Sequence, residues 1–257
     1  MNTERLLLPI FSKIQMATIY HFQPWITKSA KTFLSALSAP TDQFNKLKKQ
    51  NLIKPVKVYP YLRNPFRYNQ FYSLVPDKIA NSMIEHQSGL IDVLMAFIYL
   101  YPDFDVNIKY TPHLMANGKI YKPDALVKLD DFKGNQYDFI IEFERSRNPI
   151  AIYNEKLAKN EKMPSFKELG LSQYTKILYI YCHERFNVFN RPIQYDLPEV
   201  KLPLQALNSG FASLMNIAAK LPDHKYRFLP YHQFNQLDIC QNKIRFSGTC
   251  KACCRVN

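Results

Sequence analysis

One stretch of the chain, YKPDALVKLDDFKGNQYDFIIEFER (residues 121–145), most constrains the fold. YKPDALVKLD and QYDFIIEFE each have the composition and apolar runs of a β-strand. DFKGN between them contains Gly134, which can adopt the positive φ that a tight turn needs. The pattern predicts an antiparallel hairpin that is symmetric about Lys133. Its apolar strands require a packed core of further strands and helices, so we expect an α+β architecture.

The predicted hairpin brings acidic residues together. Symmetry about Lys133 places Asp124 opposite Glu142, and Glu144 shares the face of Glu142 because strand side chains alternate. Three carboxylates this close repel one another unless a cation lies among them. A hard divalent ion, Mg²⁺ or Mn²⁺, is the cation that carboxylate oxygens and water favour. The alternative is a set of solvated acids paired with Arg145 or Arg147.

A helix is predicted after this hairpin, over residues 149–162, with Pro149 in its first turn. If the helix packs back on the sheet, Lys156 reaches the acidic end of the hairpin. A lysine beside metal-binding carboxylates can orient a water molecule or stabilise the charge of a phosphate.

Positive charge is concentrated at the start of the chain. The net charge of the 257 residues is +13, yet residues 1–82 carry 12 Lys and Arg against 3 acids. Such a segment is typical of a surface that neutralises nucleic-acid phosphates. A basic face that is only solvated is the alternative.

The same segment has the element order of a winged helix-turn-helix. Helical spacing of apolar residues predicts helices over 4–20, 27–38 and 41–50, and strand-like runs follow at 55–62 and 70–75. In that fold the third helix enters the major groove and the hairpin contacts the backbone of double-stranded DNA. The alternative is a winged helix that docks a protein. The predicted DNA contacts, on the third helix and at the tip of the hairpin, are Gln43, Lys46, Lys48, Lys49, Arg63, Arg67 and Tyr68.

The rest of the chain reads as a second domain. A long helix is predicted over 79–100, strands over 175–182 and 226–232, and a helix over 211–221. His86 and Asp92 are polar residues of the long helix, and a lone histidine there is most often a structural residue.

Four of the five cysteines lie in the last 18 residues, which does not suggest a disulfide framework. We expect residues 241–257 to form a reduced, Cys-rich basic tail, with a zinc site as the less favoured alternative. No apolar stretch approaches the ~20 residues that span a bilayer, so we expect a cytoplasmic protein without membrane contact.

Three short motifs carry a resemblance. They are FYSLV followed by a helix with His86 and Asp92, then Pro123-Asp124-Ala125, then Glu142-x-Glu144-Arg145 with Lys156. With these motifs the chain resembles the replication-relaxation family of plasmid and mobile-element proteins. That family joins a winged helix to a domain similar to the PD-(D/E)xK nucleases. Glu144 departs from the nucleases, which carry a lysine in its place.

The resemblance implies a winged helix over 1–78 and, over 79–240, a restriction-endonuclease-like α/β domain with a mixed sheet. It implies a metal-dependent DNA endonuclease in plasmid replication or mobilisation, with Asp124 and Glu142 holding the metal. Glu144 would be a third ligand or base, Lys156 would stabilise the phosphate, and His86 would border the site. The alternative is a non-catalytic replication initiator or transcriptional regulator with a degenerate nuclease scaffold. A homodimer or other replication proteins are the further partners expected.

Overall fold

The computed structural model describes the following residues of the chain: 4–18, 21, 40–59, 71–75, 77–80, 83–101, 104–131, 133–145, 155, 158, 162–182, 226–230, 237–240 and 243–246. The chain forms two compact units. Unit 1 comprises Met1–Tyr99 with Asn187–Tyr195, and unit 2 comprises Leu100–Phe186 with Asp196–Asn257. Each unit is described by itself.

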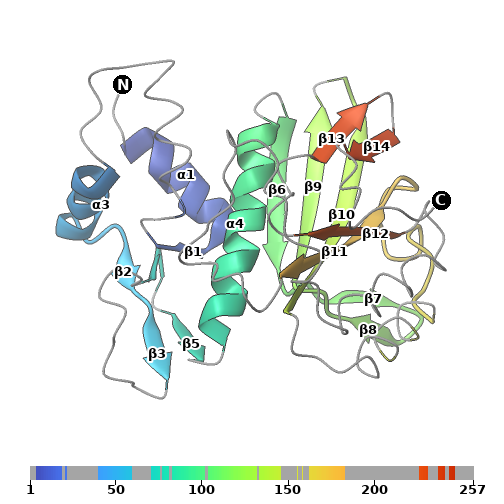
Figure 1. Ribbon diagram of the computed structural model, residues 1–257, viewed down its shortest axis with the longest axis horizontal. Coiled ribbons are helices and arrows are strands. Elements are labelled where there is room, and N and C mark those ends of the chain that lie inside the picture. The colour runs from blue at the N-terminus through green and yellow to red at the C-terminus, as the bar shows by residue number, and fades with distance from the viewer. Residues whose placement is uncertain are drawn as a thin grey trace, which may run out of the picture. The chain divides into compact units, whose positions relative to one another are not determined.

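Unit 1 combines short strands with helices (Figure 1). Its elements are α1 (Glu4–Ile14), β1 (Met16–Ala17), α3 (Pro40–Lys49), β2 (Lys54–Pro55), β3 (Lys57–Tyr59), β4 (Tyr72–Ser73), β5 (Lys78–Ala80) and α4 (Ile84–Leu100), which ends at the boundary with unit 2. β1, β4 and β2 form an antiparallel three-stranded sheet in that order. Of the hairpin predicted between residues 55–62 and 70–75, the described residues show one antiparallel pair, Pro55 with Tyr72, whereas Lys57–Tyr59 pair in parallel with β5.

Two helices begin or end at residues other than those predicted. The first was expected over 4–20, but α1 ends at Ile14, Gln15 has a φ of 57°, and Met16–Ala17 pair with β4. The long helix was expected from residue 79, but Lys78–Ala80 form a parallel pair with β3, and α4 begins at Ile84. In both places pairing with a distant segment outweighs local helical spacing. The predicted helix at 27–38 lies outside the described residues.

The core of unit 1 joins α1 to α3. Phe11 and Ile14 of α1 and Phe44 and Leu47 of α3 are each at most 3% exposed. The ring of Phe44 lies 5.8 Å from that of Phe11 and meets Tyr72 of β4 edge to face at 5.2 Å, a favoured aromatic geometry. The apolar residues of the third predicted helix thus point inward, as its spacing predicted.

Unit 2 is built on a mixed five-stranded sheet in the order β12-β11-β10-β9-β6 (Figure 1). β6, β9 and β10 are antiparallel, whereas β10, β11 and β12 are parallel. These strands are β6 (Phe104–Tyr110), β9 (Ala125–Asp131), β10 (Gln136–Arg145), β11 (Lys176–Cys182) and β12 (Tyr226–Pro230), with outer hairpins β7–β8 (Leu114–Ala116, Lys119–Tyr121) and β13–β14 (Leu237–Cys240, Lys243–Phe246). The expectation of an α+β protein with a mixed sheet is confirmed.

The register of the β9–β10 hairpin is the predicted one. Gln136 pairs with Asp130 and Ile141 with Ala125, so the hairpin is symmetric about Lys133. Gly134 has a φ of 87°, as the turn requires. Asp131 closes the turn by accepting hydrogen bonds from the side chain and backbone of Asn135 and from the backbone of Lys133, which lower the pKa of its carboxyl.

One face of the sheet has a hydrophobic cluster beside the acidic end of the hairpin. Leu126, Ile140, Ile177 and Tyr179 are at most 2% exposed and pack with Leu114 and Leu171, and Tyr121 lies against this cluster. Asp124 precedes β9 by one residue, and Glu142 follows Ile140 on the same face of β10. The acids therefore lie where the hydrophobic cluster ends. Within the described segments, no helix is both long and apolar enough to cross a membrane.

Candidate functional site

The three acids predicted for the site lie at the open end of the β9–β10 hairpin. The pairing of β9 with β10 ends at Ala125 opposite Ile141, and Asp124 and Glu142 are the next residues beyond this last pair. Glu142 is 8% exposed and Glu144, two residues later, is 2% exposed. On β11, Tyr179 is the parallel partner of Glu142. Carboxylates are rarely buried to this degree without compensating contacts.

Protein donors orient both members of the pair. The hydroxyl of Tyr121 donates to Oε1 of Glu142 at 2.5 Å, and the backbone N–H of Phe143 donates to Oδ2 of Asp124 at 2.8 Å. Burial raises the pKa of Tyr121 well above its usual value, and the charges of Glu142 and Asp124 raise it further. The Tyr121 hydroxyl therefore stays protonated, and donates, throughout the neutral pH range.

This donor set fits a hard cation in part. Mg²⁺ is commonly held by one or two carboxylates together with water and phosphate oxygens, which Asp124 and Glu142 could supply. Within the part of the chain that the structure describes, however, no three His, Cys, Asp or Glu side chains are grouped for metal binding. The pair, with Glu144 as a neighbour, is thus the extent of the donor set that the geometry supports.

Asp138 is a buried acid of β10 with a structural role. Its side chain is 0% exposed and accepts hydrogen bonds from the Ser172 backbone N–H at 2.7 Å and from the Gln136 side chain at 2.8 Å. The ammonium of Lys128 lies 3.9 Å away. These contacts fasten the segment before β11 to the sheet, so Asp138 is not part of the candidate site.

The lysine predicted to complete the site, Lys156, lies outside the described residues. Nearby, Glu155 and Ala158 are helical, and the Lys162 N–H donates to the Ala158 carbonyl, as in the predicted helix. His86 and Asp92 belong to unit 1, on α4, where His86 is partly buried.

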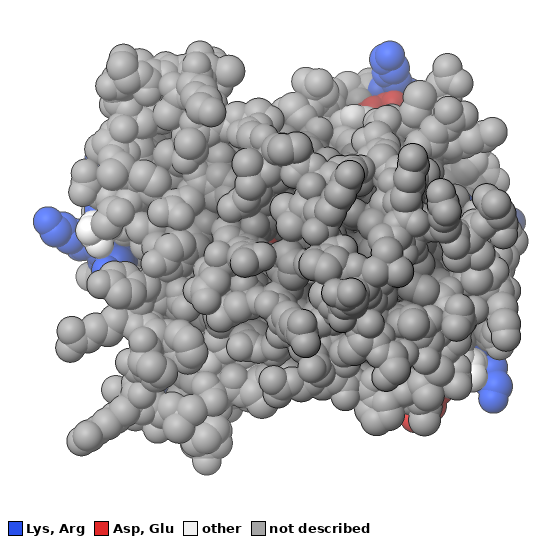
Figure 2. All heavy atoms as spheres, viewed as in Figure 1, with Lys and Arg blue, Asp and Glu red and all other residues white. Residues whose placement is uncertain are grey.

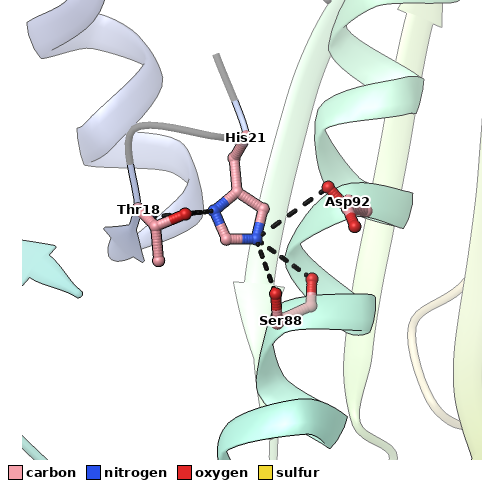
Figure 3. Close-up of polar contacts among 4 residues, drawn as sticks. All are labelled: Thr18, His21, Ser88 and Asp92. Carbon is pink, nitrogen blue, oxygen red and sulfur yellow. Dashed lines mark hydrogen bonds and ion pairs between the residues drawn. The ribbon is translucent and has the colours of Figure 1, made fainter. Parts of the chain in front are cut away.

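Asp92 instead lies beside a histidine that the sequence did not single out (Figure 3). Nδ1 of His21 accepts the Thr18 backbone N–H at 2.9 Å, so the neutral ring carries its proton on Nε2. Nε2 faces the backbone oxygen and hydroxyl of Ser88 at 3.1 and 3.2 Å and Oδ1 of Asp92 at 3.9 Å. All four residues are at most 6% exposed. The network fastens the segment after β1 to α4 and is largely shielded from solvent.

The burial of His21 predicts a loss of stability in acid. Burial lowers its pKa to about 4, and hydrogen bonds to Ser88 and Thr18 offset only part of that effect. Between pH 6.5 and pH 4 the unfolded chain binds the proton that folded His21 rejects. The contribution to the free energy of unfolding is therefore complete above pH 6.5. It falls by about 3 kcal/mol toward pH 4, at 1.36 kcal/mol per pKa unit. Urea unfolding at several pH values should show this fall in the wild type relative to His21→Gln. Equal pH dependence in both proteins would contradict it.

A second candidate site is the outer face of α3. Lys46, Lys48 and Lys49 are exposed and, with Asn45, line a surface hollow of about 420 Å³. Figure 2 shows lysine side chains projecting where Figure 1 places α3. The ammonium of Lys48 lies 5.2 Å from the centre of the Tyr72 ring and donates to Asn45 Oδ1 at 3.2 Å. The predicted contacts Arg63, Arg67 and Tyr68 lie outside the described residues, as does the side chain of Gln43.

Sequence reasoning did not single out Tyr121 or His21. Tyr121 lies only three residues before Asp124, but its place on the separate strand β8 had no local signal. His21 had no such signal, since Ser88 and Asp92 lie 67 and 71 positions away in the sequence.

Comparison with known proteins found no relative of this chain. No protein-family model, no curated protein and no solved structure matches the chain. The resemblance to the replication-relaxation family stays a prediction from its motif residues.

Proposed function

We propose that the protein binds duplex DNA through α3 of unit 1. The observation that carries this proposal is the two-sided character of α3, with Phe44 and Leu47 in the core and Lys46, Lys48 and Lys49 exposed. A helix anchored on one side and cationic on the other suits insertion into a groove lined by phosphates.

The sheet next to α3 supports the same proposal. The order α1, β1, α3, β2, β4, with β4 between β1 and β2, gives a helix followed by a sheet-forming hairpin. That is the order of a winged helix, in which the hairpin contacts the DNA backbone. The cation–π contact of Lys48 with Tyr72 restrains one of the three lysines on this face.

Salt dependence of DNA binding tests this function. Fluorescence anisotropy with a labelled duplex should give an affinity that falls steeply with salt, by about 0.9 log units per decade for each phosphate contact. A slope near zero would contradict DNA binding and favour a winged helix that docks a protein.

For unit 2 we propose metal-dependent hydrolysis of phosphodiester bonds. The observation that supports this proposal is that Asp124 and Glu142 lie directly beyond the last β9–β10 pair, Ala125 with Ile141, at the end of a buried sheet face. In this proposal both carboxylates hold Mg²⁺ or Mn²⁺, Glu144 is a third ligand or a base, and Lys156 stabilises charge on the phosphate. The ion would supply Lewis-acid polarisation of the phosphate and activation of water.

A non-catalytic role for unit 2 is the second candidate. It is favoured because Glu142 and Asp124 already accept hydrogen bonds from Tyr121 and Phe143, and no third acid groups with them in the described segments. The protein would then be a DNA-binding replication initiator or transcriptional regulator. Incubation with supercoiled plasmid separates the two, because only the enzyme produces nicked DNA when Mg²⁺ or Mn²⁺ is added.

The biological setting follows from the motif residues alone. We propose the replication or mobilisation of a plasmid or other mobile element, with DNA as the principal partner. A homodimer is the further assembly that light scattering would test.

A further inference from the structure

Tyr121 reaches Glu142 from a rigid hairpin. β7 and β8 are joined by Asn117 and Gly118, whose φ values of 52° and 71° are those of the tight turn that matches strand twist. The Asn117 side chain donates to Glu168 at 2.8 Å, which fixes the tip of the hairpin. At the other end Tyr121 pairs with Leu114, a member of the buried cluster. The hairpin that carries Tyr121 is therefore held at both of its ends.

The hydroxyl of Tyr121 has a defined chemical role at this position. It donates to Oε1 of Glu142 at 2.5 Å, a short bond typical of a donor to a charged oxygen. Because Tyr121 is neutral, the bond orients the carboxylate without neutralising its charge. A lysine or arginine in the same place would neutralise it. Such a contact leaves the electrostatic attraction of the pair for a cation intact.

We infer that Tyr121 is a positioning residue of the carboxylate site, which fixes Glu142 in the orientation that lets it share a divalent cation with Asp124. This inference rests on the metal-binding part of the proposed function. Residues that hydrogen-bond to metal ligands typically contribute 10–100-fold to metal affinity. Tyr121 is in that position relative to Glu142, although β8 contributes no ligand.

Tyr110 provides a matched control. It lies on β6 opposite Ala125, so its side chain is on the sheet face away from Asp124 and Glu142. Its hydroxyl is buried and has no hydrogen-bond partner among the residues that the structure describes. Tyr110→Phe removes the same atom as Tyr121→Phe, also within unit 2, without breaking a contact to the acids.

Calorimetric titration of Mn²⁺ into the full chain tests the inference. Tyr121→Phe should weaken Mn²⁺ binding about tenfold, whereas Tyr110→Phe should bind as the wild type does. If the wild type binds Mn²⁺ and Tyr121→Phe binds it equally well, the positioning role is overturned and the metal site stands. Equal weakening in both variants also overturns it. If the wild type binds no Mn²⁺, the proposed hydrolytic function fails and the inference fails with it.

If Tyr121→Phe does not fold, fluorine NMR on a protein that keeps the hydroxyl at position 121 tests the inference instead. With 3-fluorotyrosine placed at position 121, paramagnetic Mn²⁺ should broaden the fluorine resonance strongly. The same label at position 110 should be broadened less, because it lies on the other face. If the protein binds Mn²⁺ and the resonance at position 121 is not broadened, or is broadened no more than the resonance at position 110, the inference is overturned.

Discussion

Asp124→Asn and Glu142→Gln should each abolish metal-dependent nicking of plasmid DNA. Each substitution removes one of the two charged oxygen donors of the proposed metal site, which lie directly beyond the last pair of the hairpin. DNA affinity should stay almost unchanged, because in the proposed function α3 of unit 1 supplies it. The measurement is conversion of supercoiled to open-circular plasmid in Mg²⁺ or Mn²⁺, with duplex affinity measured on the same preparations. Lys156→Ala should reduce nicking by about 10²–10³-fold, the usual cost of one lost transition-state contact.

Asp130→Asn is the matched control for this prediction. Asp130 lies on β9 at the turn end of the hairpin, paired with Gln136, and is exposed. It should nick DNA as the wild type does. Wild-type protein that does not nick DNA with any divalent ion would favour the non-catalytic candidate. In that case Asp124→Asn and Glu142→Gln should be at least as stable as the wild type, since repulsion between the acids is relieved.

Replacement of Lys46, Lys48 and Lys49 together by alanine should flatten the salt dependence of DNA binding. If each lysine neutralises one phosphate, the log–log slope should decrease by about 2.7, at 0.9 per contact. The fold should survive, because the three side chains are exposed; the contact of Lys48 with Tyr72 is lost. Such a contact contributes about 0.5–1 kcal/mol at an exposed site.

A second triple variant distinguishes the effect of where the positive charge lies from the effect of how much positive charge the protein carries. Lys109, Lys119 and Lys133 are exposed residues of unit 2, and their replacement by alanine lowers the net charge equally. This variant should keep most of the wild-type slope. Equal losses in the two variants would show that total charge, rather than the α3 face, determines DNA affinity.

The β9–β10 hairpin was predictable from the sequence because its determinants are local. The apolar runs mark two strands that are buried over most of their length, and Gly134 sets the turn, so the register about Lys133 follows by counting. The amphipathic face of α3 was predictable for the same reason, since Phe44 and Leu47 recur at helical spacing.

The remaining features depend on partners far away in the sequence. β1 and β5 are two and three residues long and exist through pairing with β4 and β3, so no local pattern marks them. The strands β6, β7 and β8 were also not predicted. Without β8, Tyr121 had no assigned place beside Glu142, and the contact that most defines the candidate site could not be foreseen.

The symmetry of the β9–β10 hairpin about Lys133 limits which insertions the chain can tolerate. One extra residue in the turn between Asp131 and Gln136, if strand pairing shifted to absorb it, would send Asp124 and Glu142 to opposite faces of the sheet. Two extra residues would restore the shared face but would set the acids off from each other along the strands. Selection should therefore preserve the spacing of 18 positions between these acids as strongly as it preserves the acids themselves.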